Sequence, residues 1–186
     1  MKSFLSLVAL TVLVSAFAVA QVGGGATAQA IGLFTVGTAI EIAGNDGDYG
    51  DLVPGTTYTV EADGAMTPAD AGGLVEVTPV NFEITGQPGG NVLVTIGLPP
   101  YFEGGGIGGG GVRIPYSVGV QSGGWSDAAF ALGDPYNPFD PRVPTVMTLI
   151  AGTADVQIGG IIAVPIGTPD DDYEGQFQLT ASYTGL

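Results

Sequence analysis

The chain has 186 residues, of which 33 are glycine and 13 are proline, and it carries 18 acidic side chains against three basic ones. It has no cysteine and no histidine, which excludes disulfide frameworks, thiol or imidazole nucleophiles and zinc sites of the usual ligand types. Three basic residues cannot form the basic surface that binding to nucleic acid requires. Hydrophobic residues make up 45% of the chain, so the composition predicts a soluble, acidic globular protein.

The first 20 residues have the pattern of a secretory signal peptide. Lys2 precedes an apolar run from Phe4 to Val14, and small residues then lead to Ala18-Val19-Ala20. The alternative is an N-terminal membrane anchor, for which the apolar run is somewhat short. We expect cleavage after Ala20, no membrane span in the product, and a protein that is secreted, either extracellular or on the cell surface.

Beyond this leader, apolar residues alternate with period two, which is typical of β-strands that are half buried. Glycine- and proline-rich stretches separate the alternating segments. We predict an all-β protein, a single domain over residues 31–186 that forms an immunoglobulin-like antiparallel β-sandwich of about eight strands. The predicted strands, some of which could merge, are residues 31–42, 56–62, 73–78, 80–86, 91–98, 111–121, 143–150, 154–166 and 174–184.

Four local signals refine this pattern. Gly86–Gly90 contains Pro88 and predicts a hairpin turn between its neighbouring strands. The pair Gly159-Gly160 predicts a bulge within one long strand. The apolar parity changes at Pro79, as expected where a strand bends or changes sheets. A short helical turn is expected near residues 126–131.

The segment that precedes the predicted domain is unusual. Residues 21–30 contain a glycine triplet, and alternation then continues from Ala26 to Ile42, far longer than a usual strand of about five or six residues. One interpretation is a long first strand that crosses between sheets. The other is a donor strand that leaves its own domain and pairs with the open edge of another copy. The residues of this assembly strand would be Ala28, Ala30, Phe34 and Val36.

Two acidic loops are candidate Ca²⁺ sites, because hard cations take six to eight oxygen ligands. The first loop places its acids among glycines, and the second has three consecutive aspartates. Solvated surface turns explain the same residues without a metal. The candidate ligands are Asp46, Asp48, Asp51, Asp170, Asp171 and Asp172.

Catalysis has little support in the sequence. Carboxylates and tyrosines are the acid–base groups available, and no spacing singles out a pair. We therefore expect that the protein is not an enzyme. Trp125, Tyr136 and Phe139 fall in predicted loops, where they could stack on a sugar ligand or cap the end of the sandwich.

The C-terminal half resembles a family of secreted bacterial β-sandwich domains of unknown function, which are similar to pilin and fimbrial subunits. The resemblance rests on an "i-x-i-G-G" strand and on a C-terminal strand of the form Y-x-G-x-F-x-L-x-x-x-Y, together with the stretch VNFEITGQPGGNVLVTIGLP. The matching residues are Ile158, Gly159, Gly160, Tyr173, Gly175, Phe177, Leu179 and Tyr183.

The resemblance implies an extracellular structural role and no catalytic residues. We therefore expect a secreted structural subunit of a filament, pilus or surface layer that assembles with itself by β-strand addition through its N-terminal segment, with or without a secretion or assembly factor. The alternative is a monomeric secreted module that binds Ca²⁺ or carbohydrate.

Overall fold

The computed structural model describes residues 38–73, 75–105 and 111–185. In these residues the protein is all-β: fourteen short strands form three antiparallel sheets. Residues from Ala39 onward belong to one compact unit. In this described part of the chain, no helix is long and apolar enough to cross a membrane.

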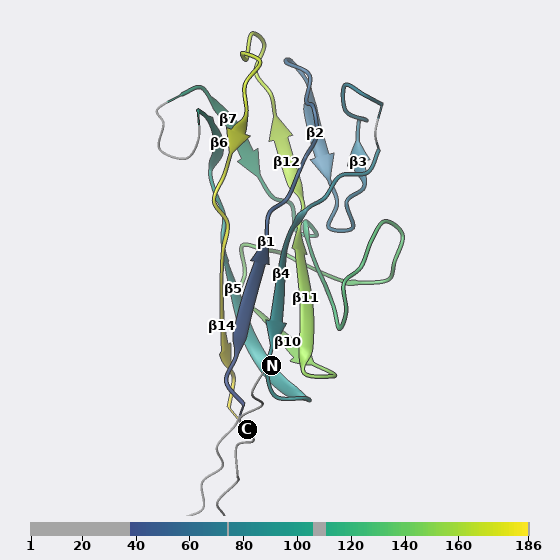
Figure 1. The fold of residues 1–186 in the computed structure, drawn as a ribbon, viewed down its shortest axis with the longest axis vertical. Coiled ribbons are helices and arrows are strands. Elements are labelled where there is room, and N and C mark those ends of the chain that lie inside the picture. Colours follow the sequence, from purple (N-terminus) through teal and green to yellow (C-terminus); the bar gives the residue numbers. More distant parts are fainter. Residues whose placement is uncertain (1–37, 74, 106–110, 186) are drawn as a thin grey trace, which may run out of the picture. The chain divides into compact units, whose positions relative to one another are not determined.

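The first two sheets pack face to face (Figure 1). The five-stranded sheet has the order β1-β4-β11-β8-β9, and the three-stranded sheet has the order β10-β5-β14. Their strands are β1 (Glu41–Asn45), β4 (Val80–Thr85), β11 (Thr153–Ile158), β8 (Gly123–Ser126), β9 (Asn137–Phe139), β10 (Thr145–Leu149), β5 (Gly90–Gly97) and β14 (Gln178–Tyr183).

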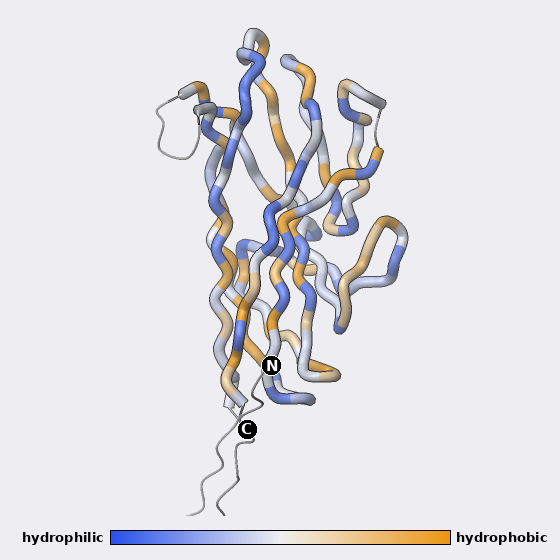
Figure 2. The backbone as a smooth tube through the Cα atoms, in the orientation of Figure 1, coloured by the Kyte–Doolittle hydropathy of each residue, from blue (hydrophilic) through white to orange (hydrophobic). Residues whose placement is uncertain are grey.

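The apolar faces of these two sheets enclose a first core. Along β4 and β11, hydrophobic and polar residues alternate, as the colours of Figure 2 show. Ten inward side chains from the two sheets are at most 8% exposed, as expected for a sandwich core about 10 Å thick. The buried members of the first core are Phe82, Ile84, Val92, Val94, Phe139, Met147, Leu149, Ala154, Val156 and Ile158.

A six-stranded sheet encloses a second core. Its order is β13-β6-β7-β12-β2-β3, and its buried residues include Tyr58, Phe102, Ile114 and Tyr116. Leu98 and Phe177 pack against both cores and so join them. The strands are β13 (Tyr173–Glu174), β6 (Tyr101–Gly104), β7 (Arg113–Ser117), β12 (Gly160–Ala163), β2 (Thr57–Val60) and β3 (Met66–Thr67).

Gly159 is the point where the chain passes from the first sandwich into the six-stranded sheet. We predicted one bulged strand over 154–166, but the structure has two strands, β11 and β12, in different sheets. A Cβ atom at Gly159 would lie 2.2 Å from the carbonyl oxygen of Val60, so only glycine allows this close approach. The Tyr116 hydroxyl donates a hydrogen bond to the Gly159 carbonyl at 2.6 Å.

The fold class is confirmed, whereas several local predictions are wrong. Gly86–Gly90 is a turn, but it carries the chain from β4 in one sheet to β5 in the other, so it is not a hairpin. Residues 126–131 contain no helical turn. The described residues form fourteen strands because the predicted strands 154–166 and 174–184 are each divided in two and the short strands β3, β6, β8 and β9 were missed. The predicted strand 73–78 is wrong, since Glu76 and Thr78 form only isolated bridges, with Ala65 and Asp48.

Candidate functional site

The two edges of the first sandwich differ, and this difference defines the candidate site. At one edge, residues 140–144 carry the chain from β9 in the five-stranded sheet to β10 in the three-stranded sheet. At the other edge stand β1 and β14, which are the terminal strands of their sheets. No strand of the described residues pairs with the outer side of either.

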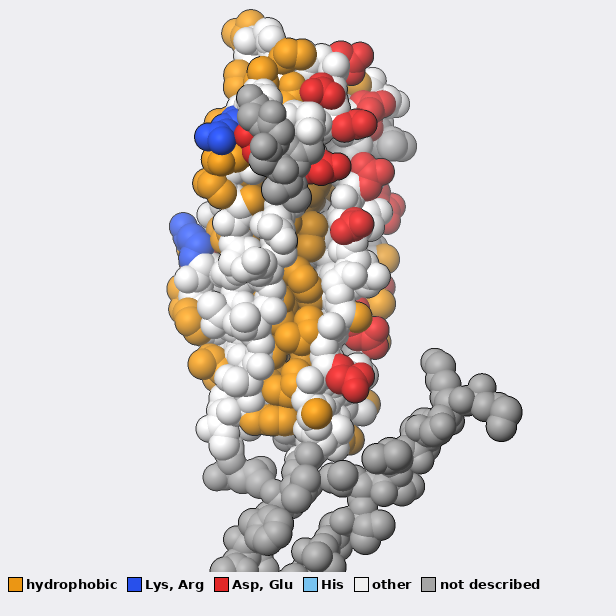
Figure 3. All heavy atoms as spheres, turned by 60° about the vertical axis from the view of Figure 1, so that its left-hand side comes forward, with side chains coloured by type: hydrophobic (Ala, Val, Ile, Leu, Met, Phe, Trp, Pro, Cys, Tyr) orange, Lys and Arg blue, Asp and Glu red, His pale blue; other side chains and the backbone are white. Residues whose placement is uncertain are grey.

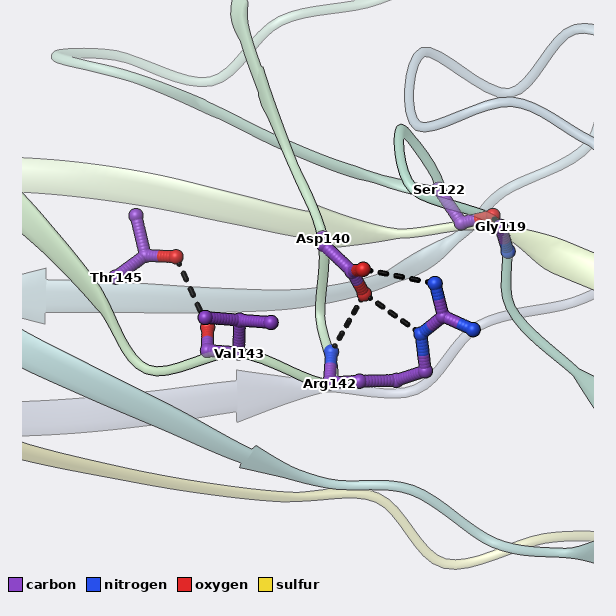
Figure 4. A network of polar contacts seen from close by, with 6 residues as sticks. All are labelled: Gly119, Ser122, Asp140, Arg142, Val143 and Thr145. Carbon is purple, nitrogen blue, oxygen red and sulfur yellow. Dashed lines mark hydrogen bonds and ion pairs between the residues drawn. The ribbon is translucent and has the colours of Figure 1, made fainter.

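The edge that residues 140–144 cross, which we call the closed edge, is held by a compact turn (Figure 4). The Asp140 carboxylate accepts hydrogen bonds from the backbone nitrogen of Arg142 at 3.0 Å and from two guanidinium nitrogens at 2.8 Å each. These bonds hold the pKa of Asp140 below its usual value. Beyond the turn, the Thr145 hydroxyl donates to the Val143 carbonyl at 3.0 Å. The inward residues of β10, Met147 and Leu149, are both 0% exposed.

The edge formed by β1 and β14, which we call the open edge, leaves its inward residues partly exposed on the β1 side. Ile42 pairs with Ile84 of β4, and residues directly opposite in a ladder point to the same face. Ile84 is 0% exposed in the first core, whereas Ile42 is 41% exposed. Gly44, two residues later, has no side chain at all, although a Cβ there would contact the Phe82 ring at 3.4 Å.

The β14 side repeats this pattern. Leu179, Ala181 and Tyr183 pair with the inward residues Ile96, Val94 and Val92 of β5, so they too face the first core. All three are only half-buried, whereas Val92 and Val94 are at most 1% exposed. Figure 3 shows a stripe of hydrophobic side chains running lengthwise along the body. We define the seam as the inward residues along β1 and β14: Ile42, Gly44, Phe177, Leu179, Ala181 and Tyr183.

Both ends of the β14 side are anchored by contacts within the body. The Tyr183 hydroxyl accepts a hydrogen bond from the Gln87 backbone nitrogen at 2.6 Å. At the other end, the Phe177 ring meets Tyr116 edge-on, with centroids 5.4 Å apart. This side of the seam is therefore a preformed surface rather than one that must fold around a ligand.

The seam lies where an immunoglobulin sandwich has its seventh strand. In an immunoglobulin sandwich the order is A-B-E-D in one sheet and C-F-G in the other. Here β1-β4-β11-β8 matches A-B-E-D, and β5 and β14 match C and F, in the same order along the chain. The place of strand G is beside β14, and no strand of the described residues fills it.

Charge is absent from the three-stranded side of the seam. The strands β5, β10 and β14 contain no charged residue, and neither do residues 86–100 and 175–185. Both arginines pair with acids elsewhere, Arg113 with Glu103 and Arg142 with Asp140. The N-terminal segment, residues 21–40, is likewise uncharged.

The predicted metal ligands do not gather in the described residues. The Asp48 side chain accepts a hydrogen bond from the backbone nitrogen of Gly50 in its own loop, at 2.9 Å. In the second loop, Asp171 accepts a bond from Asp172 N at 2.9 Å. No group of three or more acidic side chains within the described ranges is placed to hold a metal ion. Ca²⁺ binding stays a prediction without a ligand set.

The three candidate ligand aromatics mostly serve packing. Trp125 and Phe139 lie on strands β8 and β9 rather than in loops, and both contact the first core. Phe139 is 8% exposed. Tyr136 stacks on Phe130, with ring centroids 5.1 Å apart. The predicted assembly residues Ala28, Ala30, Phe34 and Val36 lie outside the described residues.

A shallow cavity of about 260 Å³ lies on the outer face of the five-stranded sheet, lined by Glu83, Asp127 and Asp155 among others. Burial raises the pKa of Asp155. Its carboxylate accepts hydrogen bonds from the amides of Asn81 and Gln157. Gln157 also donates to the Phe130 carbonyl at 2.7 Å, so this network fastens the 127–135 segment to the sheet.

Sequence reasoning found the apolar face of β14, and it predicted a strand over 31–42 where the structure has β1 over Glu41–Asn45. The predicted alternation correctly placed Ile42 on the inward face of β1, and Ile40, just before the strand, packs against the first core. Comparisons of the chain with protein-family models, with curated proteins and with solved structures found no match.

Proposed function

We propose that the protein is a secreted structural subunit that assembles with copies of itself, the N-terminal segment of one copy adding as a strand to the seam of another. The observation that carries this proposal is the seam itself. Its inward residues are apolar and partly exposed, on two terminal strands that each have an unpaired outer side. Such edges bind an added strand through main-chain hydrogen bonds.

The sequence of the N-terminal segment suits insertion at the seam. Residues 26–37 carry no charge, and in an extended strand the even positions, among them Ala28, Ala30, Phe34 and Val36, would share one side. Twelve extended residues span about 40 Å, and a six-residue strand such as β14 needs about 20 Å. The segment is therefore long enough to fill the seam and to leave a connection to its own domain.

Burial would supply the stabilisation. Full burial of Phe34 or Val36 contributes about 1.5–3 kcal/mol each, before the strand's hydrogen bonds are counted. Since β1 and β14 run in opposite directions in Figure 1, an added strand is parallel to one and antiparallel to the other. The inserted strand would also cover the exposed part of Ile42.

The form of the assembly follows from the contact. A segment of one copy on the seam of the next is a heterologous contact, and repetition without closure gives a filament. The proposed location outside the cell rests on the predicted signal peptide. The resemblance to pilin-like domains agrees with this location and with a filament. An assembly factor that covers the seam before polymerisation is compatible with this proposal.

Cysteine trapping tests the proposal, because the natural chain contains no cysteine. A donor chain with Phe34→Cys is mixed, unfolded and refolded with a size-tagged acceptor chain that carries Ala181→Cys or Leu179→Cys. Oxidation should give a covalent donor–acceptor pair. Because the two cysteines lie on different chains, a segment that folds back on its own domain cannot give this product.

The matched control is an acceptor with Thr180→Cys. Thr180 lies on the same strand but points outward, away from the seam. It should give little cross-linked product with Phe34→Cys. Equal yields from Thr180→Cys and Ala181→Cys, or no product from any acceptor, would rule out insertion at the seam.

A further inference from the structure

We propose that the outer face of the three-stranded sheet is a second self-association surface, through which copies of this chain pack side by side. This inference rests on the proposed function where filaments are concerned, but the surface is distinct from the seam. It consists of the outward residues of β10, β5 and β14, which we name the neutral face: Val146, Thr148, Asn91, Leu93, Thr95, Gln178, Thr180 and Ser182.

The neutral face is apolar along one side and carries small polar groups elsewhere. Val146 lies opposite Leu93, and the two are 55% and 37% exposed. Val143 and Ile150, just outside the two ends of β10, are 56% and 60% exposed. The Thr148 hydroxyl donates to the Asn91 side chain at 2.8 Å, so part of its polar surface is already satisfied.

The opposite outer face is acidic. Glu83 on β4 and Glu41 on the adjacent strand β1 are exposed on this face, whereas Asp155 of β11, directly opposite Glu83, is only 7% exposed. The acidic side chains in Figure 3 gather on one side of the body, and a broad uncharged area adjoins them. Charge is therefore segregated between the two outer faces of the same sandwich.

This distribution of charge favours a second copy of the chain as the partner of the neutral face. The chain has a formal charge of −15, so two copies repel each other wherever their acidic surfaces approach. Contact through two neutral faces keeps the acidic faces as far apart as the body allows. A second copy therefore fits this surface, and two sheets that pack face to face lie about 10 Å apart.

Such a contact has a characteristic salt dependence. Added salt screens the repulsion between the bodies, while an uncharged contact loses nothing to screening. Side-by-side association should therefore increase as sodium chloride rises from about 0.05 M to about 0.5 M. An interface built on ion pairs would weaken over the same range.

The experiment compares two Thr→Glu variants of the chain without its leader. Thr95→Glu places a charge at the middle strand of the neutral face, and Thr59→Glu places the same charge on the exposed side of β2. Electron microscopy counts single and laterally bundled filaments at both salt concentrations. Bundles should be lost in Thr95→Glu, with single filaments retained, and should persist in Thr59→Glu. Equal bundling in both variants, or bundles that dissolve in high salt, would overturn the inference.

If the unsubstituted chain forms no filaments, the proposed function fails and the inference is tested separately. Sedimentation at high protein concentration and about 0.5 M salt should then show dimers. These dimers should be lost in Thr95→Glu and kept in Thr59→Glu. A chain that stays monomeric at that salt concentration would overturn the inference.

Discussion

The two edges of the first sandwich are built from the same kinds of strand, yet only one of them is covered. Met147 on the terminal strand β10 is 0% exposed, whereas Ile42 on the terminal strand β1 is 41% exposed, although both face the same core. The difference is that residues 140–144 cross over the first edge, and no strand of the described residues fills the second. The chain itself covers the first edge, and we propose that an added strand covers the second.

The largest expected effect comes from truncating the inward residue at each edge. Met147→Ala should lower the free energy of unfolding by about 2–5 kcal/mol, because it leaves a cavity in closed packing. Ile42→Ala should cost about 1 kcal/mol or less in the monomer, since much of that side chain is already in water. Urea unfolding at low protein concentration measures both. Similar costs at the two positions would mean that the second edge is closed in solution.

A substitution that removes a contact to Gly159, where the chain passes from β11 to β12, should lower the free energy of unfolding by the same amount whether or not the copies are assembled. Tyr116→Phe removes the hydroxyl that donates to the buried Gly159 carbonyl, at an expected cost of about 1–3 kcal/mol. This cost should be the same in monomer and assembly, because neither edge contains the bond. Leu179→Ala serves as the comparison, since its cost should grow on assembly. Chemical denaturation in both states checks this, and a cost of Tyr116→Phe that changes with assembly would contradict it.

A smaller effect is expected at the turn of the closed edge. Arg142 lowers the pKa of Asp140, so the pair stabilises the folded state above the usual carboxyl pKa of about 4 and loses this effect as the pH falls through the lowered value. Arg142→Ala should therefore be less stable than the natural chain at neutral pH, and the difference should shrink in acid. Melting temperatures across this pH range test the sign. A difference that grows in acid would contradict the assignment.

The smallest effect is expected on the outer face of the five-stranded sheet. Burial raises the pKa of Asp155, so the folded state favours its protonated form and is stabilised less as the pH rises through the raised pKa. Asp155→Asn keeps a hydrogen-bond acceptor without the charge. The melting temperature of Asp155→Asn minus that of the natural chain should increase from acid to neutral pH. The packing at the two edges of the sandwich should be unaffected. An advantage that is largest in acid would show that the sign is wrong.

The sequence predicted the fold class and the directions of many side chains, but not which strands would be neighbours. Alternation over 174–184 placed Leu179 and Tyr183 on one face correctly, because strand geometry alone determines that. How far Leu179 is covered depends on the strand beside it, which no local pattern contains. The turn at Gly86–Gly90 has the same local chemistry whether it joins paired strands or crosses between sheets.

Two other differences have equally physical causes. The alternation of Val156, Ile158, Ile162 and Val164 continues through Gly159 while the partner strands change, so one strand was predicted where two exist. Phe139 was predicted to lie in a loop, but it lies on β9. Pro138 is nevertheless accommodated in β9, because β9 is a terminal strand that needs ladder bonds on one side only.

The most direct test of the central claim adds the N-terminal segment as a separate peptide. A chain that begins at Thr38 is mixed with a synthetic peptide of residues 26–37, and amide hydrogen exchange is followed along β14. The account predicts that the peptide slows exchange in β14 and raises the melting temperature, and that a peptide with Phe34→Asp does neither. Unchanged exchange in β14 at saturating peptide, or equal effects of both peptides, would contradict it.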